Sequence, residues 1–114
     1  MMAIEKELIT EINKILPELP VFWAIATDEA KTPYIVMQWI GGAGDTFIDN
    51  ETIGGYQRHL QVTVWDKSYS KANDYIQMIK KQLDKKGNIK AISAPIDLYD
   101  TGDHGSTLDF SILC

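Results

Sequence analysis

Hydrophobic residues recur along the first part of the chain with the spacing of an amphipathic helix. Positions 4, 8, 12 and 15 are Ile, Leu, Ile and Ile, and most residues between them are charged or polar. Pro17 and Pro20 follow, and proline does not continue a helix. The pattern therefore predicts a helix over residues 4–15.

A second helical pattern lies between Asp66 and Gly87. Its apolar residues return every three or four positions, at Ala72, Ile76, Ile79 and Leu83. Asp66, Ser68 or Ser70 can cap its start, and Gly87 is the expected end. We expect this helix to bury its apolar stripe against a sheet.

Strand patterns occupy the rest of the chain. Residues 21–27 and 33–40 are apolar and rich in β-branched and aromatic side chains, and residues 56–65 alternate with Leu60, Val62 and Val64 on one face. A short strand is expected over 91–99, interrupted at Pro95, and a last strand over 106–113. We also expect the side chains of residues 35, 37 and 39 (Ile, Met and Trp) to face away from the helices. There they are either exposed until another chain covers them, or covered internally by the twisted sheet and its loops.

The predicted order is helix, strand, strand, strand, helix, strand, strand. Consecutive strands joined by turns favour a mainly antiparallel sheet of four to five strands, with both helices on one face. The sequence therefore predicts a single α+β domain over residues 1–114, built as a two-layer sandwich. A long loop at 41–55, which we expect to be flexible, joins two central strands.

Composition narrows the possible partners. The chain of 114 residues has a formal net charge of -5 and a pI near 4.8, whereas nucleic-acid binding needs clustered lysine and arginine. The only cysteine, Cys114, is the last residue, so no internal disulfide is possible. The N-terminal segment lacks the apolar run of a signal peptide or membrane span. We expect a cytoplasmic protein without sequence-specific nucleic-acid binding or a membrane partner.

The glycine-rich stretch 41–55 resembles a phosphate-binding loop only superficially. It contains no lysine, it carries Asp45, Asp49 and Glu51, and a strand follows it where a phosphate loop needs a helix. Its oxygen donors also lack the spacing of a calcium-binding EF-hand. We therefore predict no phosphate or calcium at this loop, and no cofactor, metal or small-molecule ligand for the chain.

Candidate catalytic groups are few. His59 and His104 have no cysteine or histidine at zinc-binding spacing. Asp100 and Asp103, together with His104, could in principle serve a small hydrolase or ligand-binding domain, although such a cluster is also typical of a solvated loop. We predict no catalytic residues, and keep this cluster as the alternative.

The loop 41–55 instead has the features of an arm that meets a partner. Phe47, Ile48 and Ile53 are apolar anchors that a purely flexible loop would more often lack. Paired glycines at 41–42 and at 54–55 allow the chain to leave the sheet and return to it. The sequence therefore predicts that the loop contacts a partner.

Taken over nearly its whole length, the chain resembles the small tail-completion and tail-terminator proteins of long-tailed bacteriophages and prophages. The resemblance lies in "LPELPVFW", "TPYIVMQW", the strand-to-helix segment "YQRHLQVTVWDKSYSKANDYIQMIKKQL", and the late "PIDLYD" and "TLDFSIL" segments. None of these segments is a chemical signature, so the likeness is one of order and spacing.

The resemblance implies a non-enzymatic virion protein, assembled in the host cytoplasm and located in the tail. Such proteins form a ring, commonly a hexamer, on the end of the tail tube, where they stop its growth and meet the neck proteins. A neck or head-completion protein is the nearest alternative.

Within the implied ring, Asp45, Asp49 and Glu51 are candidates for an acidic lumen, and Arg58 for an ion pair between subunits. The resulting set of predicted interface residues is Gly41, Gly42, Asp45, Phe47, Ile48, Asp49, Glu51, Ile53, Gly54, Gly55 and Arg58.

Overall fold

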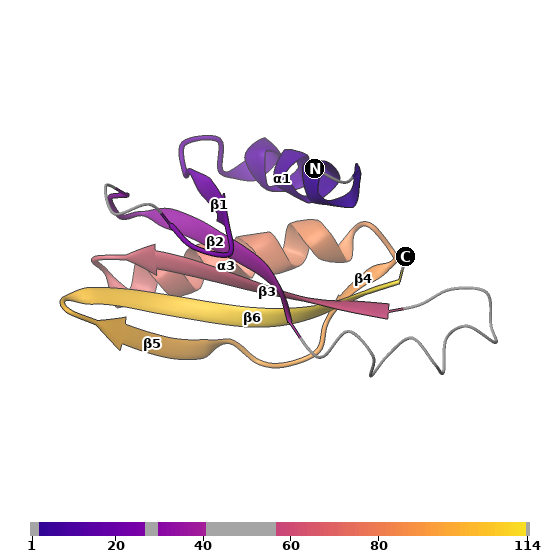
Figure 1. The fold of residues 1–114 in the computed structure, drawn as a ribbon. Helices are drawn as coiled ribbons and strands as arrows, with labels where there is room; N and C mark the ends of the chain where they lie inside the picture. Colours follow the sequence, from indigo (N-terminus) through magenta and orange to yellow (C-terminus); the bar gives the residue numbers. More distant parts are fainter. Residues whose placement is uncertain (1–2, 27–29, 41–56, 114) are drawn as a thin grey trace.

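The computed structural model describes residues 3–26, 30–40 and 57–113, which form two helices and six strands (Figure 1). The elements in chain order are α1 (Ala3–Ile15), β1 (Val21–Trp23), β2 (Tyr34–Ile40), β3 (Gln57–Asp66), α3 (Tyr69–Asp84), β4 (Ile89–Ala91), β5 (Ile96–Asp100) and β6 (Asp103–Leu113). The predicted α+β class and the predicted order of helices and strands are confirmed.

The strands form one mixed sheet in the order β1-β2-β3-β6-β4, and β5 also pairs with β6. β1 is parallel to β2, and every other pair is antiparallel. β4 and β5 lie one after the other along the same side of β6 (Figure 1). The sixth strand arises because the segment before Pro95 divides the predicted strand 91–99 into two short ones.

The first strand is shorter than predicted. It ends at Trp23 instead of continuing toward residue 27, because Ala24 has a φ of 68° and turns the chain. The Ile25 amide donates a hydrogen bond of 2.8 Å to the Trp23 carbonyl. A non-glycine residue with positive φ is uncommon, and nothing in the apolar sequence of this segment signals it.

The last two strands form a tighter hairpin than predicted. β6 begins at Asp103 rather than at residue 106, because a two-residue turn connects it to β5. Thr101 and Gly102 occupy this turn with φ values of 49° and 89°. Positive φ at both positions is typical of the type I′ turn, whose twist matches that of paired strands.

One face of the sheet carries the hydrophobic core, and both helices pack against it. The expectation that residues 35, 37 and 39 face away from the helices is wrong: Ile35 and Met37 are fully buried in this core, and Trp39 packs against it. The strand register determines which face these side chains occupy, since Met37 is paired with Val62 and both point to the same face of the sheet. The core residues are Leu8, Ile12, Leu16, Leu19, Ile35, Met37, Leu60, Val62, Val64, Ile76, Ile79, Leu83, Ile89, Leu108, Phe110 and Ile112.

The start of α3 is capped by Ser68, one of the three residues that the sequence proposed. Its hydroxyl accepts a hydrogen bond of 3.4 Å from the Lys71 amide, and the Asp66 carboxylate accepts one of 2.8 Å from the Ser68 amide. After the helix, Gly87 has a φ of 81°, a conformation that favours glycine. The helix itself ends at Asp84, three residues before the predicted stop, and Gly87 lies in the turn that follows.

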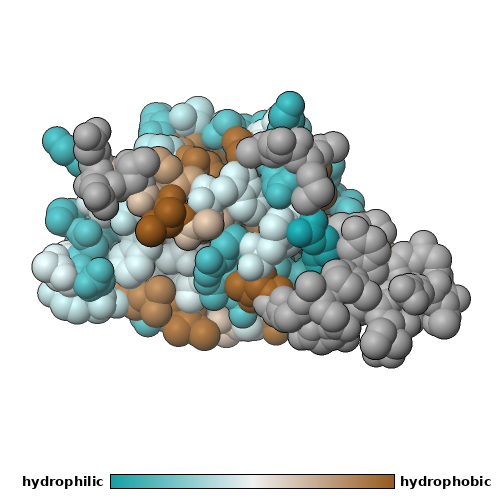
Figure 2. All heavy atoms as spheres, viewed as in Figure 1, coloured by the Kyte–Doolittle hydropathy of each residue, from teal (hydrophilic) through white to brown (hydrophobic). Residues whose placement is uncertain are grey.

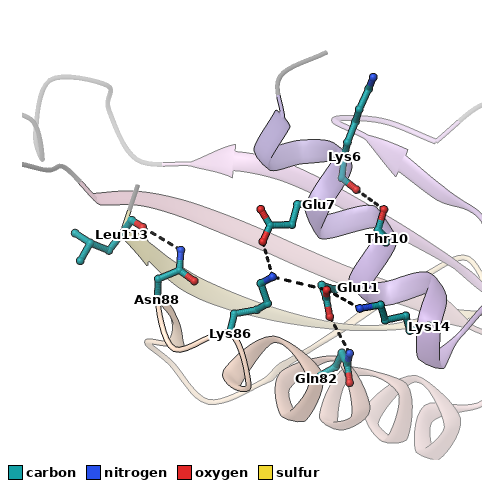
Figure 3. A network of polar contacts seen from close by, with 9 residues as sticks. All are labelled: Lys6, Glu7, Thr10, Glu11, Lys14, Gln82, Lys86, Asn88 and Leu113. Carbon is teal, nitrogen blue, oxygen red and sulfur yellow. Dashed lines mark hydrogen bonds and ion pairs between the residues drawn. The ribbon is translucent and has the colours of Figure 1, made fainter.

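A polar network joins α1 to the end of α3 (Figure 3). The Glu11 carboxylate accepts hydrogen bonds from Lys14 (3.0 Å) and from Gln82 (2.9 Å). The Lys86 ammonium is ion-paired with Glu7 and lies 3.7 Å from Glu11. The hydrogen bonds from Lys14 and Gln82 hold the pKa of Glu11 below its usual value of 4.5.

Helix α3 offers a matched test of the core. Replacing Ile79, which is fully buried, by alanine should lower the free energy of unfolding by about 2–5 kcal/mol, because it removes a core side chain and leaves a cavity. Met78→Ala, at an exposed position of the same helix, should change it by less than about 1 kcal/mol. Urea denaturation followed by circular dichroism measures both. Equal losses would contradict the assigned helix face.

The Glu11 network predicts a pH dependence. A carboxyl group whose pKa is lowered by folding stabilises the fold above its unfolded pKa, and this contribution is lost as pH falls through the folded pKa. Glu11→Gln should therefore lower stability at neutral pH, and the difference from the wild type should shrink below about pH 4.5. Denaturation curves from pH 3 to pH 7 test this, with the exposed Glu18→Gln as control. A constant difference over that range would count against the network.

Candidate assembly surface

The predicted interface residues divide into two groups. Those from Gly41 to Gly55, including the loop expected to be flexible, lie outside the described residues. Arg58 is described, and it lies at the start of β3, on the strand that follows the loop. Of the residues predicted to lie in a subunit interface, Arg58 is therefore the only one whose position is described.

Arg58 belongs to a stack of side chains within its own chain. Its guanidinium lies 3.7 Å from the centre of the Trp39 ring, and Trp39 in turn stacks on Trp23 with ring centres 5.9 Å apart. The Trp39 indole donates a hydrogen bond of 3.1 Å to Glu5 of α1. A cation over an indole face is attracted by the ring quadrupole. Arg58 therefore helps to fasten the ends of β2 and β3 to α1.

The side chains of the alternative catalytic cluster, Asp100, Asp103 and His104, do not all lie on one face of the sheet. Asp103 and His104 are neighbours in β6, so their side chains point to opposite faces. Asp103 forms an ion pair of 2.8 Å with Lys67, and the His104 ring lies 5.1 Å from Tyr99 between ring centres. In the described part of the chain, no group of three or more His, Cys, Asp or Glu side chains is arranged to hold a metal ion.

The sheet face opposite the helices, which we call the open face, is ordered by hydrogen bonds between strands. The Gln38 amide donates to the Gln61 side chain at 2.8 Å, and Gln61 donates to Asp109 at 3.5 Å. The Thr63 hydroxyl donates to the Thr107 hydroxyl at 2.9 Å. These contacts join β2, β3 and β6 across one face. They could not be predicted from the sequence, because the partners are far apart in the chain.

A hollow of about 330 Å³ lies on the open face beside these side-chain hydrogen bonds. Its apolar lining includes Tyr34, Val36, Trp65 and Leu98, and Asp100 and Asp103 supply its charge. Burial raises the pKa of Tyr34, and the two nearby carboxylates raise it further. The hollow therefore combines aromatic surface with negative charge.

Gly105 allows the Trp65 ring to lie close to β6. A Cβ atom at position 105 would meet three carbon atoms of that ring at 3.0 to 3.1 Å, closer than such contacts normally are. The register pairs the same two residues across β3 and β6. Any side chain larger than that of glycine would therefore displace the indole that lines the hollow.

The most exposed part of the sheet is its β4–β5 edge. All five residues of β5 are exposed, among them Ile96 (56%) and Tyr99 (67%). Ile92, just after β4, is 50% exposed. Figure 2 shows hydrophobic surface along the lower border of the molecule, where β5 lies in the same view. The sequence predicted a strand here without indicating that it would be an unprotected edge.

No protein-family model matches the chain, and no curated protein is significantly similar to it. Among the helices of the described residues, none is long and apolar enough to cross a membrane.

The contact between Gly105 and Trp65 can be tested directly. Gly105→Ala should lower the free energy of unfolding by about 1–3 kcal/mol, because the added methyl group overpacks the site. Combining it with Trp65→Phe should cost less than the two single losses summed, since the smaller ring leaves room for the methyl group. Chemical denaturation of the four proteins measures the coupling. Strictly additive losses would show that the ring does not constrain position 105.

Proposed function

We propose that the chain is a non-enzymatic structural subunit of a phage or prophage tail. In this role, tail-completion or tail-terminator subunits form a ring on the end of the tail tube, stop its growth and help to join the tail to the head. The partners are other copies of the chain, the tail tube and the neck proteins.

The observation that carries the proposal is the exposed edge formed by β4 and β5. Natural monomers usually cover or blunt such edges, because unpaired main-chain groups and apolar side chains recruit other chains. Here Ile92, Ile96 and Tyr99 are each at least half exposed, and β5 pairs with no described strand other than β6. A protein whose role is to bind further subunits has a use for this surface.

The tail assignment itself rests on the resemblance described above. The order of helices and strands in the fold supports it, since the resemblance implies the same order. Acidic composition also supports it, because a ring through which DNA passes must not bind phosphate tightly. In this proposal Asp45, Asp49 and Glu51 line the lumen, while Phe47, Ile48 and Ile53 contact a neighbouring subunit.

The stack of Arg58, Trp39 and Trp23 is consistent with this arrangement. Arg58 and Trp39 lie on the two strands that the loop joins, and their contact ties both strand ends to Trp23 and, through a hydrogen bond, to Glu5. Arg58 would then act mainly by positioning the arm, alongside the intersubunit ion pair that the sequence suggested.

Deleting the coding region from the phage or prophage that carries it tests the proposal. Loss of a terminator should give tails longer than normal in electron micrographs, because tube growth no longer stops. Normal-length tails detached from heads would instead indicate the neck role. Virions with normal tails and heads would overturn both assignments.

Complementation separates the roles of individual regions. The full chain should restore normal tails, whereas a chain shortened within residues 43–53 should fail if the loop contacts a neighbour. Asp103→Asn combined with His104→Gln should restore tails fully, since the proposal gives these residues no chemistry. Failure of that variant, with the fold intact by circular dichroism, would favour the hydrolase alternative.

A further inference from the structure

The edge of the sheet has a regular chemical pattern along its length. On the open face, each side chain along this edge aligns with every second residue of β6: Lys90 with Ser111, Ile96 with Thr107, Leu98 with Gly105 and Asp100 with Asp103. Ile92, whose amide donates to the Asp109 carbonyl, falls between the first two. The edge therefore presents lysine, isoleucine, isoleucine, leucine and aspartate at nearly equal spacing.

This pattern is complementary to itself when reversed. Turning a second copy by a two-fold axis at Ile96 places Lys90 opposite Asp100 and Ile92 opposite Leu98, with Ile96 opposite its own copy. We propose that two copies of the chain pair antiparallel along this edge. A parallel arrangement along the same edge would instead turn the open face of the second copy to the other side of the joined sheet, so Lys90 would not meet Asp100 there.

In the same register, main-chain N–H and C=O groups of the edge point outward, where they can form hydrogen bonds with the second copy. Since a two-residue turn joins β5 to β6, Asp100 and Asp103 form a hydrogen-bonded pair, so the N–H and C=O groups of Asp97 and Tyr99 point outward. The Ile92 amide bonds to β6, so those of Ala91 also point outward. The two-fold arrangement sets Ala91 of one copy opposite Tyr99 of the other.

The proposed contact differs between its centre and its two ends. Residues 93–95 bulge between β4 and β5, so the main-chain ladder is interrupted near the axis and is regular at Ala91 and Tyr99. At each end, Lys90 and Ile92 border a hollow of about 360 Å³ beside the edge, which receives the partner's Leu98 and Asp100 side chains. Pairing thus covers exposed apolar residues and neutralises charge.

This contact uses the edge on which the proposed tail role rests, but its symmetry differs from that of a ring. A two-fold contact is isologous and closes on itself, whereas a ring requires a heterologous contact. The pairing can therefore be measured on the purified protein, whatever the outcome of tail complementation. It describes how the free subunit protects its edge.

Charge exchange tests the register. Light scattering or sedimentation over a range of concentrations should show a dimer, and Lys90→Asp or Asp100→Lys should raise its dissociation constant about tenfold or more, since two pairs per dimer become repulsive. The combined variant should restore the wild-type value. Lys85→Asp, an exposed lysine outside the edge, serves as control. A wild type that stays monomeric, or a combined variant that stays dissociated while folded by circular dichroism, would overturn the proposal.

Cross-linking gives a second, independent result. In a Cys114→Ser background, a chain with Lys90→Cys mixed with a chain with Asp100→Cys should form a disulfide-linked heterodimer on mild oxidation. Within one chain these positions lie eight β6 residues apart, about 26 Å, too far for an internal bond. Neither chain alone should cross-link efficiently. Efficient linkage of either chain to itself would show a different register and overturn the proposal.

Discussion

The fold depends first on the antiparallel pairing of β3 with β6. Ten residues of each strand are in register, from Gln57 opposite Leu113 to Asp66 opposite His104. This pairing places Leu60 beside Phe110 and Val62 beside Leu108, so that the middle of one face of the two central strands is apolar. Because side chains alternate along a strand, a slip of one residue would turn this whole set toward solvent. Hydrophobic burial therefore fixes the register, and the register in turn places every neighbouring strand.

The elements with a clear period were predictable from the sequence. Ala72, Ile76, Ile79 and Leu83 repeat with the helical period and are all buried in α3, and the alternation of Leu60, Val62 and Val64 gave the face of β3 correctly. β2 has apolar residues on both sides, so its sequence could not show which side meets the helices. Pairing with β3 makes that choice, and it depends on residues far away in the chain.

Turn geometry and strand edges were harder to predict, because no local sequence pattern indicates them. The positive φ of Ala24 and of Thr101 shortens β1 and extends β6, yet neither residue type favours that conformation strongly. Strand order is likewise not recorded in any local pattern, so the exposure of β5 became visible only with the topology. Of the predicted interface residues, only Arg58 could be placed, and its contact with Trp39 links two strands that the sequence did separately identify.

Charge constrains how such a chain can associate. Copies with a net charge of -5 repel one another, so a stable contact between them must be locally neutral or must bury enough apolar surface to offset the repulsion. In the proposed pairing the open face of the edge meets these conditions, since it sets Lys90 opposite Asp100 with isoleucine and leucine between them. The proposed ring around DNA would have the opposite requirement at its lumen, where repulsion of phosphate is useful. An acidic chain with this apolar strip on the open face of its edge could meet both requirements, because Lys90 and Asp100 balance each other there while the chain as a whole stays negative.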